Sequence, residues 1–207
     1  MSIEIDLEKL AERVASKQTV LFIGSGMSLN ADAINNPKDK FQTWDKLIEP
    51  MIRELLTETE FNISDLKKIS YPEIIQKYEE FYGKSERDKL IREAVPTNDY
   101  KPGNLHKTLF DISKYPWHTI ITTNIDNLIE NTFYELDKKY TPVVNDIQIP
   151  GAVPMVLYKI HGTYDQPDSW VFSKKEYDNI KKNKPIIVNN IKALFSQYTC
   201  LFIGYSL

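Results

Sequence analysis

Four short, continuously apolar segments are spread along the chain, and small or polar residues follow each of them. They cover residues 19–23, 119–122, 156–160 and 200–203. Runs this short, rich in β-branched and aromatic residues, are typical of buried strands. Strands that are buried on both faces suit a parallel sheet that helices cover.

Apolar residues at a spacing of three and four predict helices between these strands. One is expected near residues 7–14, one begins near Asp126, and one covers residues 186–195. An aspartate suits the start of a helix, where the partial positive charge favours a carboxylate. This alternation predicts an α/β fold, a Rossmann-like parallel sheet with helices on both faces.

The segment from about residue 30 to residue 116 separates the first two strands and has helical patterns of its own. Helices are predicted within 44–56, 74–82 and 90–95, and Pro50 should kink the first of them or mark its boundary. The segment is too long for a simple crossover and too apolar for a linker. We interpret it as a helical module inserted beside the sheet.

The whole chain, 1–207, is expected to form one domain that includes this module. The last predicted strand ends at Gly204, three residues before the final residue. A doubly wound domain would continue there with a helix and further strands. We therefore expect the fold to be incomplete at the C-terminus and a further domain to lie beyond residue 207.

Composition excludes several classes of protein. Hydrophobic residues make up 42% and charged residues 27% of the chain, which is typical of soluble globular proteins. The formal charge of −3 lacks the basic excess of a general nucleic-acid binder. No apolar run approaches the roughly 18 to 20 residues that cross a bilayer, and the acidic N-terminus does not resemble a signal peptide. We expect a cytoplasmic protein that binds neither membrane nor nucleic acid.

The residues that follow the four strands carry the candidate chemistry. They are Gly24, Ser25, Gly26 and Ser28 after the first strand, Thr123, Asn124 and Asp126 after the second, His161 after the third, and Gly204 and Ser206 after the fourth. Ligands of open parallel sheets bind outside the carboxyl ends of the strands. We therefore expect these residues to converge on one crevice.

Gly24 and Gly26 can adopt positive φ and let backbone N–H groups approach an anion such as pyrophosphate. The dinucleotide-binding fingerprint has a third glycine where this chain has Leu29. The motif alone is weak, and a tight strand-to-helix turn stays open as its alternative.

Asn124, Asp126 and His161 are the candidate catalytic residues. An asparagine can orient a water or a sugar hydroxyl, and an aspartate can accept from an amide or a ribose hydroxyl. A histidine can act as a general base near neutral pH. The alternatives are an asparagine turn, a helix cap and a histidine that the backbone satisfies. His106 and His118 are interpreted as structural.

In this order, the four motifs resemble those of the sirtuin family, namely Gly-Ala-Gly-x-Ser, Thr-Gln-Asn-Ile-Asp, His-Gly and Gly-Thr-Ser. Ser25 stands for the alanine of the first motif and Thr123 for the glutamine of the second. Deacetylating sirtuins also carry a four-cysteine zinc module, which cannot form in a chain whose single cysteine is Cys200. These features look like the zinc-free, sirtuin-like branch of bacterial antiviral defence proteins.

The resemblance implies an NAD glycohydrolase that depletes NAD in antiviral (antiphage) defence. It implies NAD as the substrate, no zinc, a fused or associated sensor or effector partner, and a homo-oligomer. Asn124 would orient the ribose and the attacking water, Asp126 would contact the carboxamide or ribose, and His161 would be the base. Gly24, Gly26 and Ser28 would hold the diphosphate, Ser25 and Thr123 would also bind the cofactor, and Gly204 and Ser206 would contact the adenosine side.

Other functions fit the same motifs. An NAD-dependent protein deacylase would use NAD as cosubstrate, and a non-catalytic module would bind NAD or ADP-ribose to control a partner. A purely structural α/β domain is the third alternative. If His161 is the base it must be neutral, so activity is expected to fall as the pH drops through its pKa.

Overall fold

The computed structural model describes residues 6–58 and 62–205. Its centre is a five-stranded sheet in the order β5-β6-β4-β1-β7, and every strand pair in it is parallel. The strands are β1 (Thr19–Ile23), β4 (Thr119–Thr122), β5 (Thr141–Val143), β6 (Val156–Lys159) and β7 (Thr199–Ile203). The predicted α/β class with a parallel sheet is confirmed.

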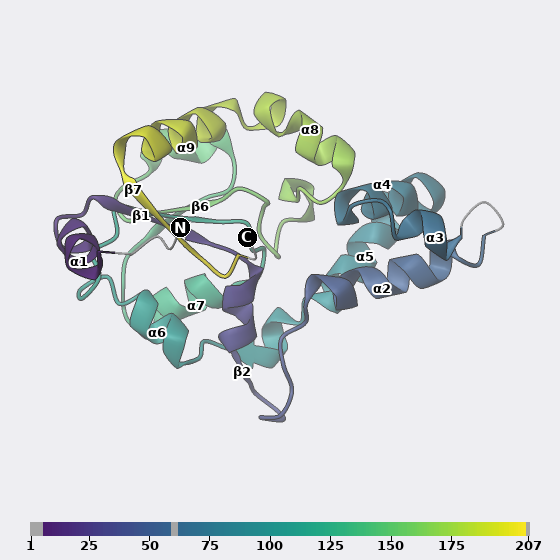
Figure 1. Ribbon diagram of the computed structural model, residues 1–207, viewed down its shortest axis with the longest axis horizontal. Coiled ribbons are helices and arrows are strands. Elements are labelled where there is room, and N and C mark those ends of the chain that lie inside the picture. Colours follow the sequence, from purple (N-terminus) through teal and green to yellow (C-terminus); the bar gives the residue numbers. More distant parts are fainter. Residues whose placement is uncertain (1–5, 59–61, 206–207) are drawn as a thin grey trace.

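Helices cover both faces of this sheet, as Figure 1 shows. They are α1 (Leu7–Ala15), α6 (Asn104–Leu109) and α7 (Leu128–Glu135) on one side and α9 (Pro185–Gln197) on the other. Within β1, Leu21 and Ile23 pack in the core with α7, whereas Val20 and Phe22 pack in the core with α9. Successive side chains of a strand point to opposite faces, so a strand covered on both faces must be apolar throughout.

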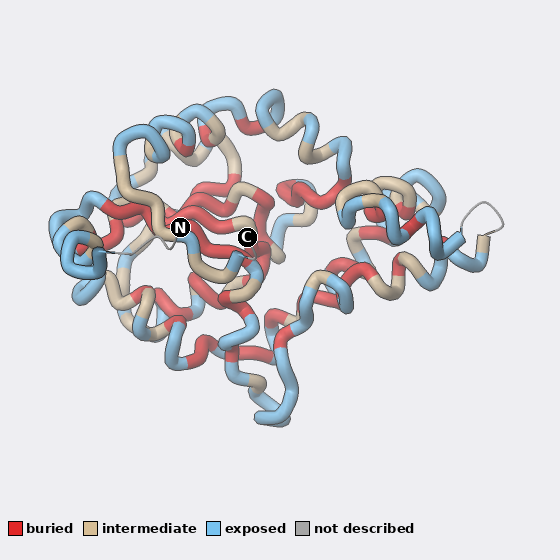
Figure 2. Tube along the Cα trace, in the orientation of Figure 1, coloured by how far each residue is buried: buried red, intermediate tan, exposed pale blue. Residues whose placement is uncertain are grey.

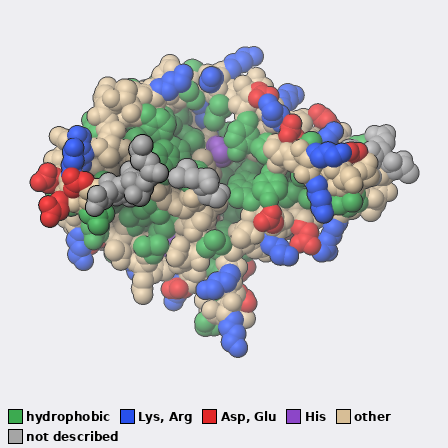
Figure 3. Space-filling view, in the orientation of Figure 1, with side chains coloured by type: hydrophobic (Ala, Val, Ile, Leu, Met, Phe, Trp, Pro, Cys, Tyr) green, Lys and Arg blue, Asp and Glu red, His purple; other side chains and the backbone are tan. Residues whose placement is uncertain are grey.

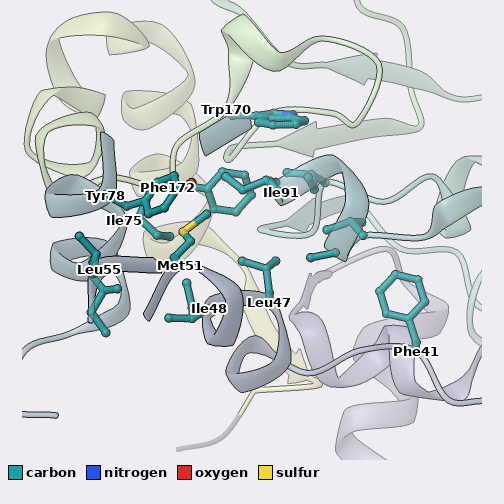
Figure 4. Packing of buried hydrophobic residues seen from close by; sticks show 14 of the residues in the cluster. Phe41, Leu47, Ile48, Met51, Leu55, Ile75, Tyr78, Ile91, Trp170 and Phe172 are labelled. Carbon is teal, nitrogen blue, oxygen red and sulfur yellow. The ribbon is translucent and has the colours of Figure 1, made fainter. Parts of the chain in front are cut away.

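The segment between β1 and β4 supplies a group of helices that projects to one side of the sheet (Figure 1). We call it the helical module: α2 (Trp44–Leu55), α3 (Ile63–Leu66), α4 (Tyr71–Tyr82) and α5 (Lys84–Ala94). Figure 4 shows Phe172, which follows β6, among Met51, Ile75 and Tyr78 of the module. Figure 2 shows buried residues both in the sheet and along the inner sides of these helices. The module is therefore packed against the chain that follows the site-bearing strand β6.

Shorter elements connect these parts. They are η1 (Ser25–Asn30), β2 (Asp32–Ala33), η2 (Thr97–Asp99), β3 (Tyr100–Lys101), η3 (Asp146–Gly151), η4 (Pro167–Ser169) and α8 (Lys174–Asn183). Strands β2 and β3 pair in antiparallel fashion as a separate small sheet. The element η1 begins directly where β1 ends, so the first motif lies at the carboxyl edge of the large sheet.

Pro50 lies inside α2, which excludes the boundary, and the kink stays a prediction. Two elements differ from the sequence prediction. Strand β5 escaped the prediction because it has three residues, one of them Pro142, which is tolerated at a sheet edge. Helix α8 escaped because it buries none of its residues and has no apolar stripe. Its capping box, in which Ser173 and Glu176 bond each other's backbone N–H, was the available signal.

A buried arginine joins the helical module to α8. The guanidinium of Arg87 is fully buried and pairs with Glu79 at 2.6 Å, Asp88 at 2.6 Å and Glu176 at 2.8 Å. Glu176 also accepts the N–H groups of Phe172 and Ser173. A buried cation requires such pairing, because desolvation penalises an unpaired charge. The same carboxylate thus begins α8 and fixes it to the module.

Candidate functional site

Three polar side chains from two loops form a buried hydrogen-bonded group at the carboxyl edge of the sheet. The Ser28 hydroxyl donates to Asp126 Oδ2 at 2.7 Å. The Asn124 amide donates to Ser28 Oγ at 3.0 Å and to the Gly24 carbonyl at 3.1 Å. Ser28, Asn124 and Asp126 are 2%, 9% and 5% exposed. The structure thus brings the first two motifs into direct contact.

The ends of β1 and β4 fix this group in place. The Thr122 hydroxyl donates to the Ile23 carbonyl at 3.0 Å and accepts the Asn124 N–H at 3.0 Å. The other oxygen of Asp126 accepts the Leu128 N–H at 3.1 Å, at the start of α7. The N-cap residue of α7 is Asn127, and Asp126 bonds the first N–H of the helix from one position earlier while it takes part in the polar group.

The glycines of the first motif pack against the loop after β7. A Cβ on Gly24 would lie 2.6 Å from the Gly204 carbonyl oxygen, and one on Gly26 would lie 2.9 Å from it. The N–H groups of Gly24 and Gly26 donate to the carbonyls of Ile203 and Gly204, both at 2.9 Å. Gly204 has a φ of +78°, which favours glycine. In this structure the Gly24 and Gly26 amides therefore donate to carbonyls of the chain itself. Within residues 24–28, Ser25 is the exposed residue.

Tyr205 holds the second and fourth motifs together. Its hydroxyl lies 2.8 Å from Thr123 Oγ1 and donates to the Ile23 carbonyl at 3.2 Å. Burial raises the pKa of Tyr205 to about 12, so the hydroxyl keeps its proton at neutral pH. Ser206, which the sequence assigned to the adenosine side, lies outside the described residues.

We expect Tyr205→Phe to lower the free energy of unfolding by about 1 kcal/mol, because two hydrogen bonds to one hydroxyl are lost. In a chain of this size the midpoint of thermal unfolding should fall by about 2 to 4 °C. Tyr134→Phe is the matched control, since Tyr134 is 88% exposed. Equal midpoints for the two variants would contradict this role of Tyr205.

His161 lies on the loop after β6, and Asn124 lies on the loop after the neighbouring strand β4. Thr122 of β4 pairs with Lys159 of β6, so Asn124 and His161 each follow a paired position by two residues. His161 is 8% exposed, and its Nδ1 lies 3.5 Å from the Tyr177 hydroxyl. Burial, with a smaller effect of the Lys184 ammonium, lowers the pKa of His161 to about 4. The imidazole is therefore neutral at physiological pH.

The glycine after this histidine, Gly162, packs closely against Ser169 and leaves no open space there for a ligand. A Cβ on Gly162 would lie 2.5 Å from Ser169 Oγ and 2.6 Å from the Ser169 carbonyl oxygen. Gly162 also has a φ of +93°. Its role is to let the loop after β6 turn and pack on itself.

Lys184 is a buried cation beside this loop, and its ammonium donates to the carbonyls of Ile160 and Ser169 at 2.9 and 3.1 Å. We expect Lys184→Met to raise the pKa of His161 above about 4, because a positive charge that opposes the imidazolium is removed. Burial should keep it below the ordinary value. An NMR titration of the imidazole measures this, with exposed Lys182→Met as control. A pKa that stays constant or falls would exclude the influence of Lys184.

A pocket lies between the sheet edge and the helical module. One wall is polar, with Ser25, Ser28, Thr123, Asn124 and Asp126; the other is largely apolar, with Phe41, Trp44, Leu47, Ala94, Val95 and Phe172. Figure 3 shows hydrophobic side chains grouped on the face where the module joins the sheet domain. Five of the predicted site residues line this pocket, whereas His161 lies on the adjoining loop and is not among the described lining residues.

The described ranges, residues 6–58 and 62–205, hold neither a candidate metal-binding group nor a candidate membrane-spanning helix. In these ranges no three His, Cys, Asp or Glu side chains form a group that could hold a metal ion. In the same ranges no helix combines the length and the apolar character that a membrane span requires.

The sequence did not single out Lys159, Tyr177, Lys184 or the aromatic wall of the pocket. Lys159 had a signal, because a lysine inside an otherwise apolar, buried strand needs a partner. The aromatic wall of the pocket had no such signal in the sequence, since Trp44 and Phe172 look like ordinary core residues until the fold brings them to the sheet edge.

Comparison with protein families gives a match to a model described as "SIR2-like domain", over residues 118–207. This range contains the second, third and fourth motifs. The first motif, in η1, lies outside it and reaches the matched part through the hydrogen bonds of Ser28 and Gly24.

Curated relatives align over nearly the whole chain. Defense-associated sirtuin 2 of Bacillus subtilis is 25% identical over 207 residues, covering 97% of this chain and 19% of that protein. The NAD(+) hydrolase ThsA of Acinetobacter baumannii is 27% identical over 210 residues, covering 98% of this chain and 39% of that protein. The NAD(+) hydrolase ThsA of Bacillus cereus is 24% identical over 215 residues, with coverages of 99% and 40%. The chain thus spans well under half the length of these relatives.

Proposed function

We propose that this chain is a SIR2-like protein and that it hydrolyses NAD in antiviral defence. One NAD and one water would give nicotinamide, ADP-ribose and a proton. The observation that carries the proposal is the Asn124–Ser28–Asp126 group on one wall of the pocket. The printed names of the relatives agree with it, since several are NAD(+) hydrolases and one is a defence-associated sirtuin.

The pocket suits the nicotinamide end of NAD. It combines an apolar wall with a few placed polar groups, as small-molecule sites do. The aromatic wall, with Trp44 and Phe172, suits a flat ring. On the polar wall, Asn124 and Asp126 present acceptor oxygens for a carboxamide N–H or a ribose hydroxyl.

Cleavage of the nicotinamide–ribose bond passes through an electron-poor, oxocarbenium-like ribose. We assign Asn124 to the orientation of the ribose and the attacking water, and Asp126 to the carboxamide or ribose. His161 is neutral at physiological pH because burial lowers its pKa to about 4. It can therefore accept a hydrogen bond from the water or a ribose hydroxyl and take the proton as the bond to ribose forms.

For the rest of the dinucleotide, the glycines and the two hydroxyl residues receive different roles. Gly24, Gly26 and Gly204 form the closely packed base on which the loops meet. Ser25 is exposed at that base, and Thr123 lines the pocket beside it. We propose that Ser25 and Thr123 contact the diphosphate and that Gly204 approaches the adenosine side.

The direct test is nicotinamide release from NAD by the full-length protein, followed by chromatography. Equal amounts of nicotinamide and ADP-ribose are expected without any acyl-peptide. Release that depends on an acyl-peptide would instead indicate a deacylase. Tight NAD binding without release, also with a partner protein present, would indicate a sensing module.

The wider context is part of the same proposal. We propose a cytoplasmic protein in which this unit is fused to or associated with a sensor or effector partner and forms homo-oligomers. Size-exclusion chromatography with light scattering measures the assembly, with and without NAD. A monomer in both conditions would remove the oligomer from the proposal and leave the hydrolysis untouched.

A further inference from the structure

A single buried lysine contacts both loops that carry the proposed catalytic residues. Lys159 is the last residue of β6 and is 1% exposed. Its ammonium donates to the Asp126 carbonyl at 2.7 Å and to the Ile125 carbonyl at 3.3 Å. It also donates to the Thr163 hydroxyl at 3.3 Å, two residues after His161. Lys159 thus joins the loop after β4 to the loop after its own strand.

An acidic partner compensates the charge of this lysine. Glu130, on the first turn of α7, lies 2.5 Å from the Lys159 ammonium through its Oε1. A buried ammonium is costly unless it is paired and hydrogen-bonded, and here both conditions hold. Burial raises the pKa of Glu130, and the ammonium of Lys159 opposes that change. The pair keeps net positive charge away from a site where a cationic ribose would develop.

Other hydrogen bonds also join the two loops. The Tyr164 N–H donates to the Ile125 carbonyl at 2.8 Å, the Thr163 hydroxyl donates to Asn127 Oδ1 at 3.4 Å, and the Asn127 side-chain amide donates to Asp165 Oδ2 at 3.0 Å. Lys159 donates to two successive carbonyls of the first loop, on either side of the residue whose side chain bonds Ser28. Its loss would therefore remove two polar contacts from the backbone at Asp126.

We propose that Lys159 is a positioning residue that holds the Asn124–Asp126 loop against the His161 loop, and that Glu130 fixes its ammonium in place. The proposal rests on the proposed function, because it assigns a role in the same reaction. Lys159 acts through the two loops. It is not one of the described residues that line the pocket. Its effect should therefore fall on the turnover step more than on the binding of NAD.

The test compares Lys159→Met, Glu130→Gln and Phe133→Leu in the full chain. Methionine keeps the length of the lysine side chain without its charge and donors. Lys159→Met should lower kcat about 10- to 100-fold, which is the scale of a displacement near 1 Å, while KM changes less than about 3-fold. Glu130→Gln should show the same pattern more weakly. Phe133→Leu only loosens the packing of α7, where Phe133 is fully buried, and should keep kcat within about 3-fold.

Hydrogen exchange supplies a readout that is independent of activity. The Asn124 N–H donates to the Thr122 hydroxyl and the Leu128 N–H donates to Asp126 Oδ1. Both amides therefore report the order of the loop after β4. Peptides covering 123–128 should exchange at least about 10-fold faster in Lys159→Met, and peptides from β1 should not change. If Lys159→Met does not fold, Glu130→Gln takes its place in both measurements.

The outcomes separate the two proposals. A wild-type protein without nicotinamide release would contradict the proposed function, and the exchange of residues 123–128 would still decide the role of Lys159. Unchanged kcat and unchanged exchange in the lysine variant would overturn the positioning role. So would an equal loss of kcat in Phe133→Leu, because the effect would then follow general destabilisation.

Discussion

Asn124→Ala is expected to reduce nicotinamide release from NAD by at least about 100-fold, a loss of nearly 3 kcal/mol in transition-state stabilisation. The amide of Asn124 bonds Ser28 and Gly24 at the pocket wall, and the proposal gives it the ribose and the attacking water. The change also removes two buried hydrogen bonds, so the free energy of unfolding should fall by about 1 to 3 kcal/mol. Steady-state nicotinamide release, measured well below the unfolding midpoint, gives the result.

Asn131→Ala is the matched control for this experiment. Asn131 is exposed on α7, one element further along the chain, and should retain wild-type turnover. Calorimetry of both variants shows how much of any loss comes from unfolding. Wild-type turnover in a folded Asn124→Ala protein would remove Asn124 from the mechanism and leave the pocket as a binding site.

His161 should make the protein sensitive to acid between about pH 6.5 and pH 4. The unfolded chain binds a proton at this residue near pH 6.5, whereas burial lowers the folded pKa to about 4. Stability is therefore complete above pH 6.5 and is lost as the pH falls toward 4. The difference corresponds to about 3 kcal/mol, and His161→Gln should lack that part of the loss. Urea unfolding at several pH values measures it.

Under the proposed function, the same titration should set the acid limit of NAD hydrolysis. In the free protein, kcat/KM should not follow a group near pH 6.5 and should fall only toward pH 4, and His161→Gln should be at least about 100-fold slower at pH 7. His118→Gln is the control, because His118 is only partly buried and lies outside the pocket. An acid limb of kcat/KM near pH 6.5 that disappears in the His161 variant would contradict the effect of burial.

The sequence was sufficient to predict β1, β4, β6 and β7, because each of these strands is a short, mostly apolar run. Ile120 and Ile121 of β4, for example, pack in opposite cores. The three-residue strand β5 and the polar helix α8 produced no apolar pattern. Prediction from periodicity therefore succeeded for four strands, including the edge strand β7, and failed for β5 and α8.

The sequence singled out residues that the structure brings together, but it did not predict the hydrogen bonds between them. Asn124 and Asp126 were singled out from the sequence, but their shared bond to Ser28 depends on a separation of nearly one hundred residues. The amides of Gly24 and Gly26 were expected to face an anion, and in the structure they bond the loop after β7. A short motif cannot reveal such pairing, since glycine permits close approach by a ligand or by the chain itself.

The pocket has two walls with different origins. The polar wall depends on the strand ends, where each side chain is held by its neighbours. The facing aromatic wall comes from the helical module and from Phe172. Under the proposed function, exchanges on the polar wall would disturb the reaction, whereas a change of size at the half-buried Trp44 would alter which molecules fit. Selectivity would then be open to redesign separately from reactivity.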